Sequence, residues 1–406
     1  MWIDLSPLFK NRDFRYLYFG QFVSFFGTML SLVALPYQVY QLTGSTFAVG
    51  ILGVIELVPL LFTAFIGGAL ADVMDRKKLL IMSEIGMALG CLVLIANAIL
   101  PQPHLWLIYV IAGGLSGLSG LHRPSLDATI PRLVSHEEIQ SASILASLKG
   151  TVGMIGGPAA AGLCISYFGL PWTYALDFAT FAFSIVALMQ IRSLAPSEAR
   201  ERPSLKSIKE ALNYAMSRHE LLGTYLVDFA AMVFAMPNAL FPAMSVTFGG
   251  TKILGWLYAA PAVGALIVTV FSGWSHKIKR HGMAVIIAAS LWGTSMACVG
   301  LSYTLWGVLF FLALAGAADG VSGIFRVTIW NETIPDRIRG RMASLEMISY
   351  MSGPLLGNTF AGFLASVTST QIAITSGGSL CVLGVFLSAL LLPGFWKYHK
   401  IQKTSA

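Results

Sequence analysis

Charged side chains are scarce in this sequence. Asp, Glu, Lys and Arg make up only 11% of its 406 residues, whereas soluble proteins carry about 25%. A soluble domain of this length can bury a core, but it needs more polar surface than this to stay in water. The scarcity argues against a soluble protein, and the 56% hydrophobic content indicates a membrane protein.

Cysteine and histidine are also few, and neither is clustered. The four cysteines lie inside apolar runs without CxxC spacing, which favours small packing residues over redox or metal roles: Cys91, Cys164, Cys298 and Cys381. The seven histidines are scattered, and the sequence has no HExxH pair, no GxSxG elbow and no phosphate-binding GxxxxGK loop. We therefore expect a protein that is not an enzyme, uses no ATP directly, and holds no metal or cofactor.

Long apolar runs, in contrast, are abundant. A helix needs roughly 20 apolar residues to cross the hydrocarbon of a bilayer. Twelve segments qualify: 16–40, 46–71, 79–99, 104–126, 141–167, 171–191, 220–247, 253–275, 283–302, 304–329, 341–367 and 371–395. They predict an all-α integral membrane protein with twelve transmembrane helices.

The basic residues between these segments mark one side of the membrane. Lys and Arg collect in cytoplasmic loops, and with the N-terminus inside, the opposite loops contain only Lys252. The inner loops and tail hold Arg76, Lys77, Lys78, Arg132, Lys277, Lys279, Arg280, Arg337, Arg339, Arg341, Lys397, Lys400 and Lys403. This asymmetry places both termini in the cytoplasm. It also explains the net charge of +7 as topology, so nucleic acid is not an expected partner.

The chain also repeats itself. GGALADVMDRKKLLI after the second span returns as SGWSHKIKRHGMAVI after the eighth, and LDATIPRLV after the fourth returns as WNETIPDRI after the tenth. The two pairs have nearly the same offset. They predict two pseudo-symmetric six-helix halves, 1–191 and 220–406, joined by a cytoplasmic linker over 192–219. Duplicated halves with a site between them are the architecture of secondary transporters that alternate between inward-open and outward-open states.

The linker holds one segment with helical periodicity. In SLKSIKEALNYAM the apolar residues recur at helical spacing at Leu205, Ile208, Leu212 and Met216, with lysines outside the stripe. This pattern predicts a short amphipathic helix on the inner membrane surface. A plain connector is the alternative.

The loop after the second span resembles the signature of the major facilitator superfamily, Gly-x-Leu-Ala-Asp followed by bases. Gly68, Asp72, Arg76 and Lys77 fit that signature, whereas Asp75 replaces a glycine. In that family the acid meets the positive N-terminal end of the eleventh helix and a nearby base. The resemblance therefore implies that Asp72 is a latch toward Arg339 and Arg341, stabilised there by typically 0.3–1 kcal/mol. Charges that only fix topology are the alternative.

The fifth span carries GTVGMIGGPAAAG. Its core of Gly153, Gly157 and Pro158 resembles the signature of drug and metabolite exporters of the superfamily, although Gly162 comes one residue late. Glycines on one face allow close approach of another helix, and proline leaves a carbonyl unpaired, so the helix can bend at a moving interface. Close packing without a gating role is the alternative.

Further stretches resemble the siderophore-exporter branch of the superfamily, of the enterobactin type, and its macrolide-efflux relatives. They include NRDFRYLYFGQFVS, GWLYAAPAVGA and RGRMASLEMISYMSGPLLG. The resemblance implies a secondary active exporter of small amphiphilic metabolites, driven by proton antiport through alternating access. It further implies a monomer in the bacterial inner membrane, with cargo and the lipid bilayer as partners. Multidrug or macrolide efflux is the alternative.

Ionisable residues inside the spans are the candidate working groups. Such a group costs at least ~2.5–3.5 kcal/mol at bilayer depth on insertion scales, so each is a functional candidate. Glu56, Asp319 and Asp228 are the candidates for proton coupling, and Lys149 is a candidate for attracting an anionic cargo. Simple hydrogen bonding to a neighbouring helix is the alternative. Arg326 lies nearer the cytoplasmic end of its span, where snorkelling or a salt bridge suffices.

Polar and aromatic residues within the spans are further candidates for lining a substrate cavity. With Lys149 they are Gln21, Tyr37, Asn238, Tyr258 and Asn358. Polar groups in helical bundles often only bridge helices, which is the alternative for each of them.

Overall fold

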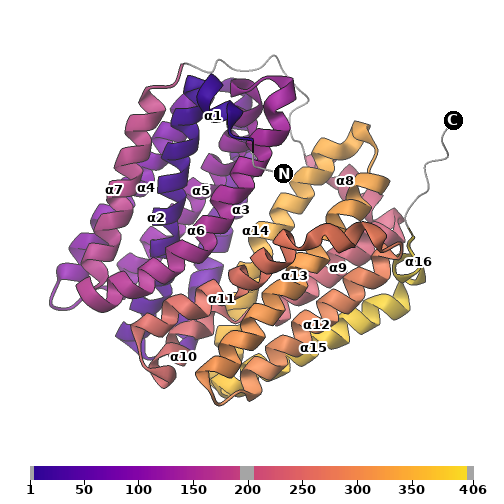
Figure 1. The fold of residues 1–406 in the computed structure, drawn as a ribbon. Helices are drawn as coiled ribbons and strands as arrows, with labels where there is room; N and C mark the ends of the chain where they lie inside the picture. The colour runs from indigo at the N-terminus through magenta and orange to yellow at the C-terminus, as the bar shows by residue number, and fades with distance from the viewer. Residues whose placement is uncertain (1–3, 193–204, 400–406) are drawn as a thin grey trace. The chain divides into compact units, whose positions relative to one another are not determined.

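The structure is a computed structural model that describes residues 4–192 and 205–399, without the side chains of 65–73, 205–209, 336–337, 340 and 343–344. Every regular element of these residues is a helix (Figure 1). This agrees with the predicted all-α membrane fold, because the backbone of a lipid-exposed segment must satisfy its own hydrogen bonds.

The helices form two units. Unit 1 comprises residues 1–44, 54–203 and 245–259, and unit 2 comprises 45–53, 204–244 and 260–406, as far as each is described. The predicted halves, 1–191 and 220–406, differ from these units in that 45–53 cluster with the second unit and 245–259 with the first. Two long helices, α3 (Thr46–Val73) and α11 (Thr251–Val270), therefore contribute to both units.

Unit 1 is built from the helices of the first half. They are α1 (Ser6–Lys10), α2 (Arg12–Thr43), α4 (Arg76–Ile99), α5 (Leu105–Leu133), the 3-10 turn η1 (His136–Glu138), α6 (Ile139–Phe168) and α7 (Leu170–Met189), with parts of α3 and α11. Helix α7 packs against both α2 and α4 (Figure 1). Helices α2 and α7 meet along small residues: a Cβ on Gly20 would lie 3.0 Å from that of Ala187, and one on Gly27 would overlap Thr180.

Unit 2 is built from the helices of the second half. They are α8 (Leu205–Ser217), α9 (His219–Phe234), η2 (Asn238–Leu240), η3 (Ser272–Lys277), α12 (His281–Leu301), α13 (Leu305–Thr333), α14 (Asp336–Val367), α15 (Thr370–Leu391) and α16 (Pro393–Trp396). Helix α10 (Phe241–Phe248) is divided between the units. Helix α12 packs against α13 and α15 (Figure 1), and Gly293 meets the backbone of Gly378 at that contact.

Eleven helical segments among the described residues are long and apolar enough to cross a membrane. The remaining predicted span, 341–367, coincides with α14, which has 32 residues and is not among the eleven. Helix α14 is less apolar than the others because it carries Ser349, Ser352 and Asn358 within its length.

The seventh predicted span, 220–247, is not one continuous helix. Helix α9 ends at Phe234, and α10 begins only at Phe241 after the turn η2. Pro237 lies in the break, and proline lacks the N–H that a continuing helix needs. The side-chain oxygen of Asn358 on α14 accepts a hydrogen bond from the Ala239 N–H at 3.2 Å, so another helix satisfies part of the interrupted backbone.

The linker contains the predicted helix, α8, but a different face of it packs on the protein. Ala211 and Ala215 are buried against Leu221 and Met342 of unit 2. Leu212 and Met216 of the predicted apolar stripe are 45% and 58% exposed, and the side chains of Leu205 and Ile208 lie outside the described residues. Alanines allow close packing on the unit, which leaves the larger apolar residues outside. Contact of α8 with the membrane surface stays a prediction.

The close contact between α11 and α13 in unit 2 can be tested by substitution of a glycine. A Cβ at Gly316 would lie 1.8 Å from the Pro261 carbonyl oxygen, whereas a Cβ at Gly323, also on α13, would meet nothing within 4 Å. We expect Gly316→Ala to lower the free energy of unfolding by about 1–3 kcal/mol through overpacking. Gly323→Ala, the matched control, is expected to raise it by roughly 0.5–1 kcal/mol because glycine weakens a helix. Denaturant unfolding of both purified variants measures this, and equal effects would contradict the close contact.

Candidate functional site

A buried arginine of unit 2 holds two carboxylates. Asp319 and Arg326 lie seven residues apart on α13, which places them two turns apart on one face of the helix. The Arg326 Nη2 lies 3.3 Å from Asp319 Oδ1, and Nη1 donates to Asp228 Oδ1 on α9. We call these three residues the Arg326 cluster. Only 10% of the Arg326 side chain is exposed, and of the two expected roles, snorkelling or a salt bridge, it forms salt bridges.

The Arg326 cluster carries excess negative charge. One guanidinium faces two carboxylates, and Glu346 on α14 also interacts with it electrostatically. Asp228 is buried, whereas the Asp319 side chain is 53% exposed within the protein alone. Asp319 is therefore the more exposed carboxylate of the cluster. Asp228 and Asp319 were predicted separately from the sequence. The structure joins them through Arg326, which was not itself predicted as a proton-coupling residue.

Glu56, the third predicted proton-coupling residue, lies in unit 1. It is half-buried on α3, where its backbone carbonyl accepts a hydrogen bond from Ser116 of α5 at 2.9 Å. Its carboxyl group interacts electrostatically with Tyr258 of α11, another predicted cavity residue. The structure thus brings two of the predicted residues together, but in a different unit from the Arg326 cluster.

Unit 1 has a buried carboxylate that sequence reasoning missed. Glu84 on α4 is fully buried, and its Oε1 accepts hydrogen bonds from Gln21 on α2 at 2.6 Å and Ser184 on α7 at 2.9 Å. His122 on α5 brings its Nε2 to 3.3 Å from the same oxygen. We call these residues the Glu84 network. The rule that selected Glu56, an ionisable group inside an apolar span, applies equally to Glu84 and would have found it.

A second buried acid of unit 1 was missed as well. Asp177 on α7 accepts hydrogen bonds from Ser31 on α2, from Thr180 at 3.3 Å and from the Cys91 thiol at 3.5 Å. Both of its oxygens therefore have partners. Cys91 is buried, as its apolar surroundings in the sequence predict, but it also contacts a carboxylate.

A cleft in unit 1 contains the predicted cargo-binding lysine. It is lined by Phe14, Leu17, Tyr18, Gln21, Leu126, Ile130, Ala142, Ala146 and Lys149. Lys149 is the only charged residue in this lining, and its Nζ lies 5.9 Å from the centroid of the Phe25 ring. An apolar cleft with one cation suits an amphiphile that carries an anionic or hydrogen-bonding group.

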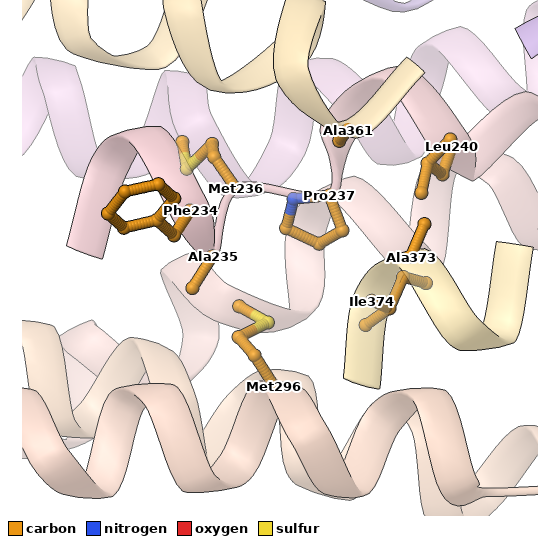
Figure 2. Close-up of a pocket in the computed structure, with 9 residues that line it drawn as sticks. All are labelled: Phe234, Ala235, Met236, Pro237, Leu240, Met296, Ala361, Ala373 and Ile374. Atoms are coloured by element: carbon orange, nitrogen blue, oxygen red, sulfur yellow. The ribbon is translucent and has the colours of Figure 1, made fainter. Parts of the chain in front are cut away.

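Unit 2 has a second pocket, lined by apolar side chains, at the break after α9. Figure 2 shows Met296 of α12 facing the segment of Phe234, Ala235, Met236 and Pro237. Leu240, Ala361, Ala373 and Ile374 complete its lining, and the empty volume is about 200 Å³. Asn238, predicted as a cavity residue, begins η2 in the backbone break, and Asn358, also predicted, supports η2 from α14. Tyr37 is half-buried on α2. Cavity roles for these three residues stay predictions.

The bases of the loop after α3 bind helix ends within unit 1. Arg76 donates to the Ala128 carbonyl of α5 at 2.7 Å, and the Lys77 Nζ donates to the Met189 and Ile191 carbonyls at the end of α7. Cations are favourable at helix C-termini, where carbonyls lack intrahelical partners. Asp75, which departs from the family signature, caps the N-terminus of α4 by accepting from the Lys77 N–H.

The proposed latch is only partly described. The side chains of Gly68 and Asp72 lie outside the described residues, so the latch role of Asp72 stays a prediction. Arg341 pairs with Glu210 on α8 at 2.5 Å, and the Arg339 side chain is exposed at the start of α14. In unit 2, Arg341 thus holds the linker helix.

The glycines of the exporter motif lie at close helix contacts. A Cβ on Gly153 would stand 2.4 Å from the Phe25 ring, and one on Gly157 would stand 2.4 Å from the Met29 Cβ, both on α2. Next to them, the Pro158 carbonyl would lie 2.5 Å from a Cβ on Gly255 of α11. The motif therefore allows close packing of α6, and a gating role for it stays a prediction.

In unit 2, the C-terminal segment is hydrogen-bonded to the helices. The Tyr398 hydroxyl donates to Glu332 of α13 at 3.1 Å, and His281 of α12 lies 3.5 Å from the same carboxylate. Burial raises the pKa of Tyr398, so its hydroxyl stays protonated and able to donate at neutral pH. In the part of the chain that is described, no three His, Cys, Asp or Glu residues gather in a way that would hold a metal ion.

Comparisons with known proteins place these features in a family. The profile of the family described as transmembrane secretion effector matches residues 4–401. The enterobactin exporter EntS of Citrobacter koseri is 28% identical over 393 residues, which cover 96% of this chain and 94% of that protein. The EntS protein of Shigella dysenteriae is 28% identical over 395 residues, with the same coverage.

Solved structures show the same fold at low identity. A POT family transporter in complex with 5-aminolevulinic acid is similar with a TM-score of 0.73 at 12% identity, over 95% of this chain and 97% of that one. The nucleoside transporter NupG is similar with a TM-score of 0.71 at 14% identity, over 94% and 98% of the two chains. These are transporters of the major facilitator fold, which use ion gradients rather than a cofactor. The chain is a multi-pass membrane transporter that belongs to the transmembrane secretion effector family of the major facilitator superfamily.

Proposed function

We propose that this transporter is a proton-coupled exporter of small amphiphilic metabolites, and that its cargo is a siderophore of the enterobactin type. The Arg326 cluster carries the proposal, because two carboxylates on one buried guanidinium form a group whose charge changes when a proton binds. Buried groups of this kind are rare inside spans and mark proton pathways.

The cluster suggests how a proton would act. With both acids ionised, the guanidinium neutralises one charge, and the remaining negative charge stays on the more exposed Asp319. Protonation of Asp319 makes the Arg326 cluster neutral overall, because Arg326 and Asp228 then balance each other. A neutral cluster tolerates removal from water better than a charged one. Protonation would therefore bias the unit toward states in which the cluster is closed from solvent, which is the requirement for antiport by alternating access.

The cleft around Lys149 supports the proposed cargo. Its apolar walls fit the rings of an amphiphile, and its single ammonium group fits an acidic phenol or carboxylate. Catechols offer both features. The two EntS relatives are named for enterobactin export, and their similarity extends along nearly the whole chain. By the same relationship we infer the bacterial inner membrane as the location. The distribution of bases favours cytoplasmic termini, and we expect a monomer.

Multidrug or macrolide efflux is the second candidate. The pocket at the break after α9 has no polar side chain in its lining and includes Met236 and Met296 (Figure 2). Methionine adapts to ligands of different shape. If this pocket and not the Lys149 cleft binds cargo, neutral macrolides should be transported in preference to catechols.

The proton role of Asp319 is tested by transport in proteoliposomes. We expect an imposed pH gradient to accelerate enterobactin transport by the wild-type protein. Asp319→Asn should reduce the rate to the value without a gradient while exchange of internal for external enterobactin persists, because exchange needs no net proton movement. Glu137→Gln is the control, since Glu137 is exposed in the turn η1 of unit 1. Full gradient dependence in Asp319→Asn would contradict the proposal, and Glu56→Gln tests the other candidate in the same way.

The charge balance of the cluster is tested by stability. We expect Arg326→Leu to lower the free energy of unfolding by ~3–5 kcal/mol, because it leaves two carboxylates without their base. The loss should shrink at acid pH, where protonation neutralises those carboxylates. Combining Arg326→Leu with Asp228→Asn and Asp319→Asn should recover most of the stability. Unfolding of the purified variants at neutral and acid pH measures both effects, and a loss independent of pH would show that packing alone is responsible.

A further inference from the structure

The Glu84 network is unlike the other buried polar groups of unit 1, because its hydrogen bonding is incomplete. Four helices contribute to it, and every contact that they make with the Glu84 carboxylate reaches one oxygen, Oε1. Among the residues that the structure describes, neither Glu84 Oε2 nor His122 Nε2 has a hydrogen-bond partner, although both atoms are buried. Native proteins satisfy most buried polar atoms, so two such atoms in one network require an explanation.

Reversible binding of one proton to this pair explains why Glu84 Oε2 and His122 Nε2 both lack a hydrogen-bond partner. With a single proton on either side chain, Glu84 and His122 together carry no net charge. Without that proton the pair carries one negative charge, which the hydrogen bonds from Gln21 and Ser184 stabilise. The network thus has two protonation states that the same surroundings accept. A group that only holds helices together needs a single protonation state.

Asp177 shows what a purely structural acid looks like in the same unit. It is equally buried, but three side chains, Ser31, Cys91 and Thr180, donate to its two oxygens. No histidine, lysine or arginine contacts it among the described residues. Its hydrogen bonds therefore favour one protonation state, and Asp177 provides a matched control for Glu84.

The other charged groups near the network are already engaged. On α4 itself, Arg76 lies two turns before Glu84 and binds the Ala128 carbonyl. On α5, Arg123 is paired with Asp127 at the exposed surface. From α7 the facing polar groups are Ser184 and, further along, Asp177, and from α2 it is Gln21. His122 is thus the base that faces Glu84.

Gln21 connects this network to the cleft that holds Lys149. Its amide donates to Glu84 at 2.6 Å and lies 3.2 Å from the Ser184 hydroxyl, while the same residue lines the cleft. An occupant of the cleft that takes a hydrogen bond from the Gln21 amide removes a donor from Glu84. Because that donor stabilises the carboxylate, its loss favours the state in which Glu84 and His122 hold the proton. Cargo and proton would then be linked through one side chain.

We propose that Glu84 and His122 form a second proton-carrying site, within unit 1, and that Gln21 couples it to the occupancy of the Lys149 cleft. This inference rests on the proposed proton-coupled export, which it extends from the Arg326 cluster to the first half of the chain. Glu84 and His122 carry the proton, and Gln21 is the positioning residue.

Infrared difference spectroscopy of the full-length protein in lipid tests the site directly and needs no cargo. We expect the carbonyl band of protonated carboxyl groups to grow as pH is lowered, to lose one component in Glu84→Gln, and to keep that component in Asp177→Asn. His122→Gln and Gln21→Leu should each shift the midpoint of its titration while leaving the band in place. If Glu84→Gln does not fold, these two variants decide the matter. An unshifted midpoint in both, or a band unchanged in Glu84→Gln, would overturn the proposal.

Transport separates this proposal from the function it rests on. In proteoliposomes with enterobactin as the probe, Glu84→Gln should lose the acceleration by a pH gradient, and Asp177→Asn should keep it. If the wild type does not transport enterobactin but the infrared band behaves as expected, the cargo is wrong and the proton site stands. If the wild type transports enterobactin with a pH gradient and Glu84→Gln retains that dependence, export stands and the second proton site is wrong.

Discussion

Hydrocarbon offers no hydrogen bonds, so a polar side chain inside the membrane must find its partner on another helix. This constraint organises both units. In unit 1, Glu84 and Asp177 draw together α2, α4, α5 and α7, and in unit 2 the Arg326 cluster joins α9 to α13. Helix packing in lipid has little hydrophobic driving force of its own. The polar contacts therefore set which helices are neighbours, and close glycine contacts set how near they lie.

The two units meet the same constraint with different chemistry. Unit 2 uses a guanidinium, which stays charged, so its proton chemistry belongs to the carboxylates around it. Unit 1 uses a histidine, which can itself hold or release a proton near neutral pH. The sequence repeat relates the halves, yet the copies have diverged at the loop where Asp72 is replaced by Lys277 and inside the bundles. Divergence of this kind suits a transporter, because two identical sites would respond to one proton gradient at the same step.

Much of the fold follows from the sequence, because length and hydropathy decide where a helix crosses a membrane. The linker helix and the repeat are also visible there. The break after Phe234 was missed, since a proline inside a span either kinks or interrupts a helix, and only the partner residue Asn358 shows which. The face of α8 that packs on the protein was not part of the prediction, which placed the apolar stripe on the membrane surface. The periodicity of Leu212 and Met216 identifies an apolar stripe, but it does not show that Ala211 and Ala215 fit more closely against the neighbouring helices.

Individual acids of the candidate sites were predicted from the sequence, but the residues with which they pair were not. Glu56, Asp228 and Asp319 stand out because an acid inside an apolar run is conspicuous, yet nothing in the sequence shows that Arg326 meets two of them. The pairing determines what each acid does. Asp177, with all its oxygens bonded, holds helices together, whereas Glu84, with one oxygen unpaired beside a histidine, retains room for a proton. Both acids are buried, so burial does not distinguish them. The number of carboxylate oxygens without a hydrogen-bond partner separates the proposed proton-carrying acid from the structural one.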